Sequence, residues 1–431
     1  MPPLLFLTQR IPYPPIKGEK IRPLQILRHL AQSWDVHLGC LVDDPRDQEH
    51  VPTVAALCAG SHFATLDRRR AKLLCLTGLL TGEPLSVTFY RDAGLAAWVR
   101  GVMRDVRPAA VFVCSSNMAP YVLDLPVTGV RLCDLADVDS EKWRAYADTG
   151  AGPSGSDAGG GAFEGTASSS ARTIACASRN RASGVRLVHA REWRRTAALE
   201  GRIAREFDWS TFVSAEEAAL FAGQHPGEAA RIRAISSGVD AAYFDPVPGY
   251  PVPYPDDRAN FVFTGTMDYP PNMDAAAWFA GAILPIIRRT LPNAAFHIVG
   301  SSPAPQVLAL AGDGVTVTGR VPDVRPYVAH AVCVAPMRIA RGIQNKVLEA
   351  MAMARPVVVT PDALEGIGAQ PGTEVLLADT ADAFAAACIQ ATRDGGQEIG
   401  RAARRRVLQD YVWASRLRGF DALLPQKGTP A

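Results

Sequence analysis

A basic loop that runs into a helical pattern, in the second half of the chain, is the segment best suited to chemistry. An apolar run ends at Pro336, a loop reaches Gly342, and a helical pattern then continues to Ala354. Free N–H groups at the start of such a helix, on Ile343 and Gln344, suit a phosphate group. We therefore expect an anionic ligand at this helix start.

Charged side chains around the same point support this expectation. Arg338, Arg341 and Lys346 add positive charge near the helix start, and Glu349 lies further along the helix. A carboxylate at that position can accept hydrogen bonds from the two hydroxyl groups of a ribose. From residue types alone, a solvated basic loop with Glu349 in a surface ion pair is an equally good interpretation.

A second candidate is the loop from Pro15 to Lys20, which follows the first apolar run of the chain. Gly18 permits a tight turn near a phosphate, and Lys17 and Lys20 are the basic residues that would contact it. The alternative is an ordinary solvated loop between a strand and a helix.

Three aspartates, Asp134, Asp137 and Asp139, follow an apolar run and form a third candidate. Carboxylates at the carboxyl end of a strand indicate a polar site that holds an acceptor hydroxyl or orients a sugar. Asp139 or Ser140 before Glu141 also fits a helix N-cap, so Asp134 and Asp137 are the better candidates. A carboxylate cluster can in principle bind a metal ion.

The elements that must position these groups alternate between strand and helix patterns, which predicts an α/β fold with parallel sheets covered on both faces. Two Rossmann-like doubly wound domains are expected, and such sheets bind ligands beyond the carboxyl ends of their strands. With the two sheets facing each other, both sets of loops would meet in one cleft. The predicted strands are Leu4–Leu7, Val36–Val42, Ala109–Cys114, Val130–Leu135, Ser210–Val213, Phe261–Thr264, Ala295–Val299, Val315–Thr318, Ala331–Ala335, Pro356–Thr360 and Val375–Ala378.

The predicted domains are an acceptor-binding domain at 1–237, a nucleotide-sugar-binding domain at 238–405, and a C-terminal helix with a disordered tail at 406–431 that packs toward the first domain. The boundary follows the sequence Ser237-Gly238-Val239-Asp240. Residues 148–184 are rich in Gly, Ser and Ala, and are predicted to be a disordered insertion because they cannot bury enough apolar surface to offset their ordering entropy.

The segment after Pro336 resembles the nucleotide-binding signature of the retaining GT-B glycosyltransferases of family 4, also called group 1. Those proteins carry two glutamates separated by seven residues, and the second precedes Ala-Met-Ala and a small-Pro-Val-Val sequence. The segments 349–352 and 356–358 match the second part, whereas Arg341 stands at the position of the first glutamate. The resemblance implies that Glu349 binds the ribose, and an arginine at position 341 more naturally faces the diphosphate.

The resemblance covers most of the chain. The segment 263–274 resembles the first strand and loop of the family's nucleotide domain, with Gly265 near the donor phosphates, and 317–323, which contains Arg320, resembles the loop that cups the base. Segments 237–244 and 410–413 resemble the inter-domain entry and the final helices that cross back onto the first domain. The fold generally uses basic residues and helix dipoles, so neither a metal nor another cofactor is expected.

The resemblance implies transfer of a hexose-type sugar from a nucleotide-diphosphate donor to a hydroxyl acceptor, with retention. The acceptor would be a glycan or a lipid-linked glycan. Segments 13–22, 137–143 and 341–346 further resemble the sugar transferases of PEP-CTERM/exosortase systems, which implies a role in exopolysaccharide production. The predicted site residues are Arg341, Lys346 and Asp137 for catalysis, Gly265, Arg320, Gly342, Ile343, Gln344 and Glu349 for the donor, and Lys17, Gly18, Lys20 and Asp134 for the acceptor and phosphate loop.

Two other functions remain open at this point. A sugar-nucleotide epimerase shares the double-Rossmann fold, and Arg341 in place of a glutamate fits a non-catalytic partner that has kept the fold. A nicotinamide dehydrogenase is a weaker alternative, because neither half has a GxGxxG sequence after its first strand.

Bulk composition gives no support for several other classes of protein. The net charge of +2 gives no support for nucleic-acid binding, and the eight cysteines lack CxxC spacing, which favours free thiols in a reducing cytoplasm. We expect neither a signal peptide nor a membrane span. The basic cluster at 68–72 precedes a leucine-rich run and predicts either a peripheral contact with the inner face of a membrane or an ordinary core-facing helix with a charged start.

Overall fold

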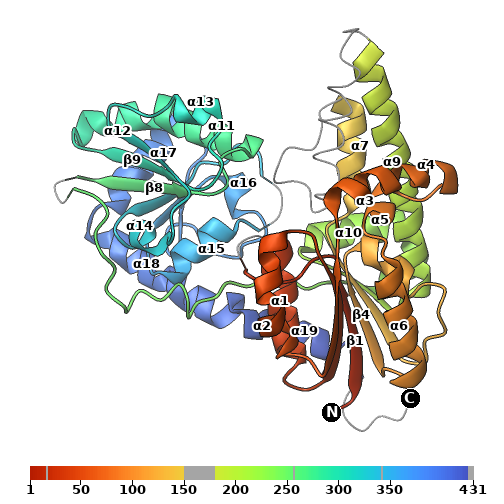
Figure 1. The fold of residues 1–431 in the computed structure, drawn as a ribbon. Helices are drawn as coiled ribbons and strands as arrows, with labels where there is room; N and C mark the ends of the chain where they lie inside the picture. Colours follow the sequence, from red (N-terminus) through yellow and green to blue (C-terminus); the bar gives the residue numbers. More distant parts are fainter. Residues whose placement is uncertain (16–17, 150–179, 256–257, 341–342, 426–431) are drawn as a thin grey trace. The chain divides into compact units, whose positions relative to one another are not determined.

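The structure is a computed structural model that describes residues 1–15, 18–149, 180–255, 258–340 and 343–425. The chain forms two compact units, and each is described here by itself (Figure 1). Unit 1 holds the described residues up to 149, residues 180–236 and residues 417–425, and unit 2 holds residues 237–416. Most of the predicted insertion, together with the tail after residue 425, lies outside the described residues, whereas 148–149 and 180–184 are helical.

The sheet of unit 1 has seven strands, all parallel, in the order β3-β2-β1-β4-β5-β6-β7. The chain leaves β1 in one direction and returns to the other side of it at β4, so the order reverses between these two strands. A reversal of this kind creates the place where doubly wound sheets bind ligands. The strands are β1 (Pro3–Thr8), β2 (Asp35–Val42), β3 (Gly60–Thr65), β4 (Ala110–Cys114), β5 (Val130–Ala136), β6 (Trp209–Phe212) and β7 (Ile232–Ala234).

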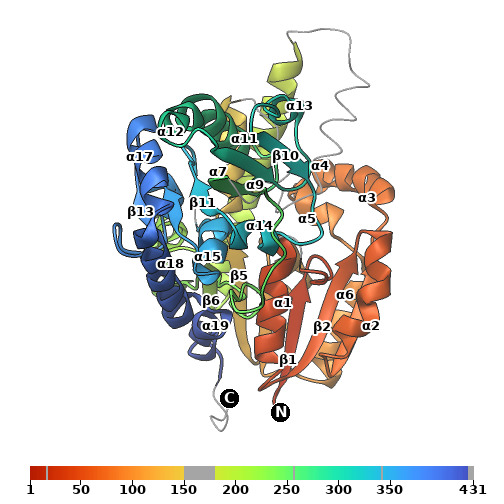
Figure 2. The same ribbon diagram turned by 90° about the vertical axis from the view of Figure 1, so that its left-hand side faces the viewer.

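Helices cover both faces of this sheet (Figure 1, Figure 2). Leu95 of α6 belongs to the core cluster that contains Leu5 and Val111, on one face. On the other face the ring of Phe112 contacts Phe420 at a centroid distance of 5.0 Å. The helices of unit 1 are α1 (Gly18–Leu30), η1 (Pro45–His50), α2 (Val51–Ala55), α3 (Arg68–Leu74), η2 (Cys75–Thr77), α4 (Gly78–Thr81), α5 (Leu85–Phe89), α6 (Ala93–Asp105), η3 (Ser116–Tyr121), α7 (Asp139–Thr149), α9 (Asn180–Glu206), α10 (Ala215–Gln224), η4 (Pro226–Arg231) and the end of α19 (Trp413–Asp421).

The end of the chain packs on unit 1. Besides the contact of Phe420, the Nε2 atom of His29 on α1 lies 2.8 Å from an Oδ1 atom of Asp421. The predicted return of the C-terminal helix to the first domain is therefore confirmed. The helical end of the chain is interrupted, because Val412 is extended and pairs with Val239 before α19 begins.

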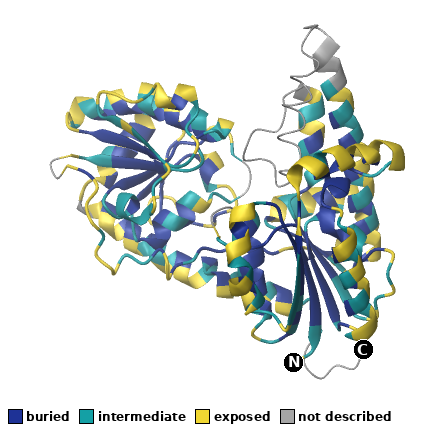
Figure 3. Ribbon diagram, in the orientation of Figure 1, coloured by how far each residue is buried: buried dark blue, intermediate teal, exposed yellow. Residues whose placement is uncertain are grey.

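Unit 2 contains a six-stranded parallel sheet in the order β10-β9-β8-β11-β12-β13, which reverses between β8 and β11. Its inner strands are buried on both faces, whereas the edge strand β10 is only partly buried (Figure 3). The strands are β8 (Asn260–Thr264), β9 (Ala295–Val299), β10 (Val315–Gly319), β11 (Val332–Ala335), β12 (Val357–Val359) and β13 (Leu376–Leu377), and the helices are α11 (Pro270–Trp278), η5 (Phe279–Ile283), α12 (Leu284–Thr290), α13 (Pro305–Leu308), α14 (Arg325–Ala329), α15 (Asn345–Ala352), α16 (Pro361–Leu364), α17 (Ala381–Ala391), α18 (Asp394–Arg406) and η6 (Val407–Tyr411).

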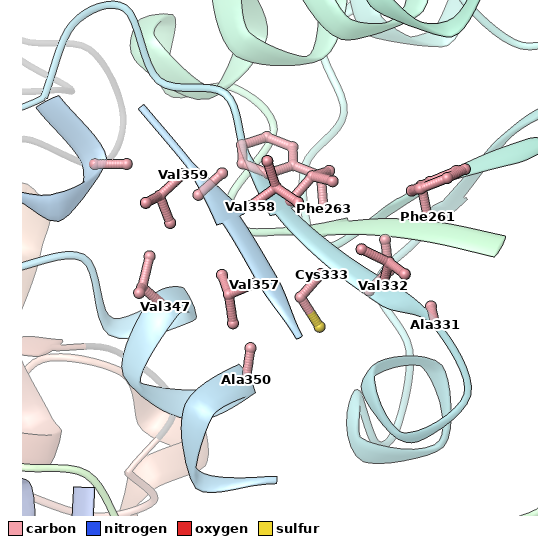
Figure 4. Close-up of a cluster of buried hydrophobic side chains, with 14 of the residues drawn as sticks. Phe261, Phe263, Ala331, Val332, Cys333, Val347, Ala350, Val357, Val358 and Val359 are labelled. Atoms are coloured by element: carbon pink, nitrogen blue, oxygen red, sulfur yellow. The ribbon is translucent and has the colours of Figure 1, made fainter. Parts of the chain in front are cut away.

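Helix α15 is anchored by its apolar face. Val347 and Ala350 pack beside Val357 of β12, next to the central strands β8 and β11 (Figure 4). Leu348, Met351 and Ala352 are buried as well, so the polar residues of α15, Asn345, Lys346 and Glu349, lie toward its start. Helix packing thus fixes where the first turn of α15 lies.

The doubly wound organisation of both halves confirms the predicted α/β fold class. The sequence prediction missed β3 and β7, which are the two edge strands of unit 1. Their sequences, Gly-Ser-His-Phe-Ala-Thr and Ile-Arg-Ala, carry polar residues and are only partly buried. Edge strands need not be apolar on both faces, so they lack the continuous apolar run that marks the central strands.

Two buried glutamates on α9 hold the starts of shorter helices. Glu192 accepts a hydrogen bond from the backbone N–H of Leu85 (2.8 Å), and Glu200 accepts one from that of Ser140 (3.2 Å). Both carboxyl groups thus satisfy N–H groups at a helix N-terminus, where negative charge is favoured. Burial nevertheless raises the pKa of Glu200 to about 8.

Replacing Glu200 by Gln should make the free energy of unfolding less dependent on pH. Between about pH 5 and pH 8 the unfolded chain releases the Glu200 proton and the native chain keeps it, so the stability of the wild type falls as pH rises. The Glu200 contribution to this fall is up to about 4 kcal/mol. Denaturant unfolding at pH 5 and pH 8 measures it, and equal pH dependence in both proteins contradicts the prediction.

Candidate functional site

The loops at the reversal point of the unit 2 sheet carry the strongest candidate site. Gly265 follows β8, and Met337 follows β11, so both lie at the carboxyl ends of the two strands between which the order reverses. Helix α15 begins eight residues after Met337, at Asn345. Ligands of doubly wound sheets bind at this place.

Lys346 lies in the first turn of α15 and is held by neutral groups. Its Nζ atom donates to Oδ1 of Asn272 (2.6 Å), lies 3.7 Å from the sulfur of Met337, and sits 4.4 Å from the ring centroid of Phe263. Burial lowers the pKa of Lys346 to about 7. An ammonium group at a helix N-terminus also opposes the helix dipole. An incoming anion would relieve both penalties.

Glu349 follows Lys346 by three residues, so it lies on the same side of α15. Burial raises the pKa of Glu349 to about 7, although the charge of Lys346 acts in the opposite direction. The ammonium form of Lys346 and the carboxylate form of Glu349 are therefore both poorly solvated. Such perturbed groups gather at functional sites more often than elsewhere.

Two glycine backbones meet next to Lys346. A Cβ atom on Gly265 would lie 2.8 Å from Nδ2 of Asn272 and 3.5 Å from Nζ of Lys346, and one on Gly300 would lie 1.7 Å from the carbonyl oxygen of Gly265. Gly300 follows β9 and has a φ of +156°. Neither position tolerates a side chain, so bare backbone borders the lysine, as a phosphate site requires.

Asn272 and Gly300 were missed by the sequence prediction. Asn272 is buried, and its Nδ2 atom donates to the carbonyl oxygen of Thr266 (2.9 Å), which orients Oδ1 toward Lys346. The available signal for Gly300 was a glycine directly after the apolar run of β9, the same pattern that pointed to Gly265. Comparing the residues that follow neighbouring strands would have identified Gly300 together with Gly265.

The structure places the remaining predicted donor residues differently. Gln344 precedes α15 at its N-cap position, and Ile343 is partly buried beside Gly366. Arg320 is exposed and follows β10, at the edge of the sheet. Arg341 and Gly342 lie outside the described residues. Arg338 is held by Asp274 (Nε–Oδ2 3.0 Å) and lies over the ring of Trp278.

The predicted phosphate loop of unit 1 has internal partners. Nζ of Lys20 forms a buried ion pair with Oδ2 of Asp47 (2.6 Å) and donates to the carbonyl oxygen of Tyr13 (3.4 Å). Gly18 begins α1, and Lys17 lies outside the described residues. The predicted phosphate contact of Lys20 therefore competes with a carboxylate that already balances its charge.

Asp134 is likewise paired. Its two oxygens accept hydrogen bonds from Nε and Nη2 of Arg22 (both 2.8 Å), and Oδ1 also accepts one from Thr211 (2.8 Å). The carboxyl group is buried, and the same arginine donates to the carbonyl oxygen of Ile235. This bidentate pair links α1, β5 and β6, so the structure gives Asp134 a structural role.

Asp137 belongs to a charged group at the start of α7. Nζ of Lys142 lies 2.9 Å from Oδ2 of Asp137 and 3.3 Å from Oδ1 of Asp139. The charge of Lys142 lowers the pKa of Asp137, whereas burial raises the pKa of Asp139. Asp137 is 40 % exposed. It stays a candidate for contact with a substrate, and Lys142 is the partner that the sequence prediction missed.

A strained residue marks the reversal point of the unit 1 sheet. Ser115 follows β4 with a φ of +78°, which is rare for a residue other than glycine. Nearby, Nδ2 of Asn117 donates to Oε1 of Gln9, which follows β1 (3.4 Å). Backbone strain of this kind is concentrated at ligand sites. Gln9, Ser115 and Asn117 are therefore further candidates on the side predicted to hold the acceptor.

Within the described residues, the structure places no three His, Cys, Asp or Glu side chains together as a metal site. The expected absence of a metal stays a prediction. The same part of the chain has no helix that is both long and apolar enough to cross a membrane.

One family model matches most of the second unit. Residues 258–394 match the model described as "Glycosyl transferases group 1". This segment is therefore similar to a group 1 glycosyl transferase domain. The segment contains the glycine pair, Asn272, Lys346 and Glu349. No curated protein matches the sequence.

Solved structures match over nearly the whole chain. Sucrose-phosphate synthase from Thermosynechococcus elongatus has a TM-score of 0.63 at 17% identity, over 98% of this chain and 98% of that chain. HepE from Anabaena, solved in complex with UDP-glucose, has a TM-score of 0.59 at 13% identity, over 98% and 99%. Trehalose 6-phosphate synthase from Burkholderia multivorans has a TM-score of 0.58 at 11% identity, over 98% and 98%. The protein therefore has the GT-B fold that the resemblance implied.

The glycine pair of this segment leads to a stability prediction. Replacing Gly300 by Ala should lower the free energy of unfolding by about 2 kcal/mol or more, because the new methyl group overlaps the carbonyl of Gly265. Gly281→Ala is the matched control, since nothing lies within 4 Å of its Cβ position. Denaturant unfolding measures both, and equal stability of the two variants contradicts the predicted contact.

Proposed function

We propose that the protein is a glycosyltransferase that moves a hexose-type sugar from a nucleotide-diphosphate donor to a hydroxyl acceptor, with retention of configuration. The observation that carries the proposal is Lys346, which is half-buried at the start of α15 beside Gly265 and Gly300, within the segment that matches the group 1 glycosyl transferase model. A diphosphate supplies the negative charge that this arrangement lacks.

The charges of the site fit a diphosphate better than a neutral ligand. Lys346 is balanced by the amide of Asn272 rather than by a carboxylate hydrogen bond, and burial disfavours its charged form. A diphosphate at the glycine pair would restore that form and would accept hydrogen bonds from bare backbone. Arg341, outside the described residues, is proposed to add a further positive charge there.

Glu349 is the proposed ribose contact. It lies one helical turn beyond Lys346, and in a nucleoside diphosphate the ribose is joined directly to the phosphates. The two residues therefore match the order of ribose and diphosphate along one ligand. The other proposed donor contacts are Gln344 and Ile343 at the helix start and Arg320 at the loop for the base.

In the proposed reaction, the bond between the anomeric carbon and the diphosphate oxygen breaks as the acceptor oxygen bonds to the same face of that carbon. The leaving diphosphate takes the proton of the acceptor hydroxyl. The share of the protein in this step is to stabilise the negative charge that develops on the diphosphate, through Lys346 and the N-terminus of α15. No side-chain base is required.

The donor is proposed to be a UDP-hexose, because HepE, which shares the fold, was solved with UDP-glucose. The acceptor is proposed to be a glycan or a lipid-linked glycan held by unit 1, in exopolysaccharide synthesis of the PEP-CTERM/exosortase type at the cytoplasmic face of a membrane. Candidates for acceptor contact in unit 1 are Asp137 and the residues after β4.

The two alternatives are separated by one incubation. A sugar-nucleotide epimerase would convert UDP-glucose without an acceptor, and a non-catalytic partner would bind it without any turnover. The proposed transferase releases UDP when a hydroxyl acceptor is added. Arg341 stands where the family that this chain resembles carries a glutamate. A result of UDP-glucose binding without turnover would therefore support the non-catalytic alternative.

Replacing Lys346 by Met or Glu349 by Gln should weaken UDP binding by about 10- to 100-fold, because each removes a charged hydrogen-bond partner worth about 1.5–3 kcal/mol. Isothermal titration with UDP measures the change, and release of UDP from UDP-glucose measures turnover. Arg104→Met, which removes an exposed charge on α6, is the control. Unchanged UDP affinity in both site variants contradicts the assignment.

UDP affinity should fall as pH rises above about 7. Lys346 has a pKa of about 7 in the free protein, and a bound diphosphate favours its charged form, so binding takes up a proton above that pH. The Lys346→Met variant should show a flatter profile. Titrations at pH 6.5, 7.5 and 8.5 measure both, and parallel profiles contradict the role of Lys346.

A further inference from the structure

A cluster of leucines covers the outer side of the segment formed by α3, η2 and α4, residues 68–81, in unit 1. The segment is continuous in the structure and lies over α5 (Figure 1). We define its leucine face as Leu73, Leu74, Leu76, Leu79 and Leu80, which are 72%, 49%, 51%, 50% and 91% exposed. Of the two interpretations that the sequence left open, the core-facing helix does not hold for these leucines.

The inner side of the segment consists of small residues. Ala71, Cys75 and Gly78 are buried and recur at helical spacing. A Cβ atom on Gly78 would lie 2.9 Å from Oγ1 of Thr88 and 3.1 Å from Cδ2 of Leu85. There is consequently no space under this side of the helix for a leucine side chain.

Hydrogen bonds fix the segment in the same orientation. The hydroxyl group of Thr88 donates to the carbonyl oxygen of Cys75 (3.0 Å), and Nη2 of Arg191 on α9 donates to that of Gly78. Rotation of the helix to bury its leucines would break both hydrogen bonds and force large side chains against α5. The exposure of the leucine face is therefore built into the packing of unit 1.

A cluster of exposed leucines marks an interaction surface. Single exposed apolar residues are common, but neighbouring ones indicate a binding site. Removing such leucines from water stabilises the bound state in proportion to the apolar area buried. Leu187 of α9, 71 % exposed, lies one turn before Arg191, which bonds to α4, and extends the apolar surface.

Basic residues occupy the start of the same segment. Arg68, Arg69 and Arg70 form the first turn of α3, and all three are exposed, with Lys72 two residues later; Nε of Arg68 also lies 3.9 Å from Oδ2 of Asp43. Positive charges at a helix N-terminus oppose the helix dipole, so they do not serve the stability of the helix. An anionic partner would compensate both the dipole penalty and the charge.

We propose that the leucine face lies on an anionic lipid surface, with the leucines in the interfacial region and Arg68, Arg69, Arg70 and Lys72 against the headgroups. The 14 residues from 68 to 81 span about 20 Å as a helix, too short to cross a bilayer but suited to lying on it. A second copy of the chain would bring the same positive charges to the interface, whereas anionic lipid brings the opposite charge.

The proposal is independent of the proposed sugar transfer, because its test reads binding alone. Full-length protein is sedimented with vesicles of phosphatidylcholine containing 30 % phosphatidylglycerol (about 0.1 M salt) and with vesicles of pure phosphatidylcholine. We expect at least tenfold tighter binding to the anionic vesicles, decreasing as salt rises. Equal binding to both vesicle types, or no binding to either, overturns the proposal.

Two variants separate the contributions. Leu76→Ser/Leu80→Ser should weaken binding to the anionic vesicles at least tenfold, and Arg69→Glu/Arg70→Glu should abolish the preference for them. Leu220→Ser/Leu308→Ser replaces two exposed leucines outside the face and should leave binding unchanged. Circular dichroism and thermal unfolding confirm that each variant is folded.

Two outcomes would overturn the assignment to lipid. Vesicle binding that survives Leu76→Ser/Leu80→Ser would show that the leucine face does not make the contact. A monomer–dimer equilibrium in sedimentation velocity that the same variant abolishes would show that a second copy covers the face.

Discussion

The central constraint of the structure is a positive charge without a fixed negative partner. Lys346 is half-buried in the first turn of α15, where the helix dipole and the loss of water both act against its charge. Its hydrogen-bond partner is the neutral amide of Asn272. The glycine pair holds the neighbouring backbone close and free of side chains. The fold thus maintains a site whose electrostatics improve when an anion binds.

The buried charges of unit 1 behave differently. Arg22 is paired with Asp134, and Lys20 with Asp47, each at hydrogen-bond distance. Truncating one member of such a buried pair leaves an uncompensated charge and is strongly destabilising. The pair of Arg22 and Asp134 therefore connects α1 to the sheet, and the pair of Lys20 and Asp47 connects α1 to η1. A functional contact in this unit is better sought at Asp137 and at the strained turn of Ser115.

Much of this arrangement follows from sequence patterns, because central parallel strands must be apolar on both faces. β1, β4, β8 and β9 are marked by continuous apolar runs, and the helix start at residue 345 by the loop before it. Apolar runs do not show which residues from different strands and helices lie next to each other. Gly300 has meaning only beside Gly265, and the partner of Lys20 lies 27 residues away, at Asp47. The leucines at 73–80 were equally consistent with a core-facing helix until the packing of Gly78 placed them outside.

The most direct test of the central claim is a crystal structure of the protein with UDP bound. We expect a phosphate oxygen within about 3 Å of Nζ of Lys346, next to the backbone of Gly265 and Gly300, with the ribose hydroxyls on Glu349. UDP bound elsewhere, with Lys346 still on Asn272, would contradict it.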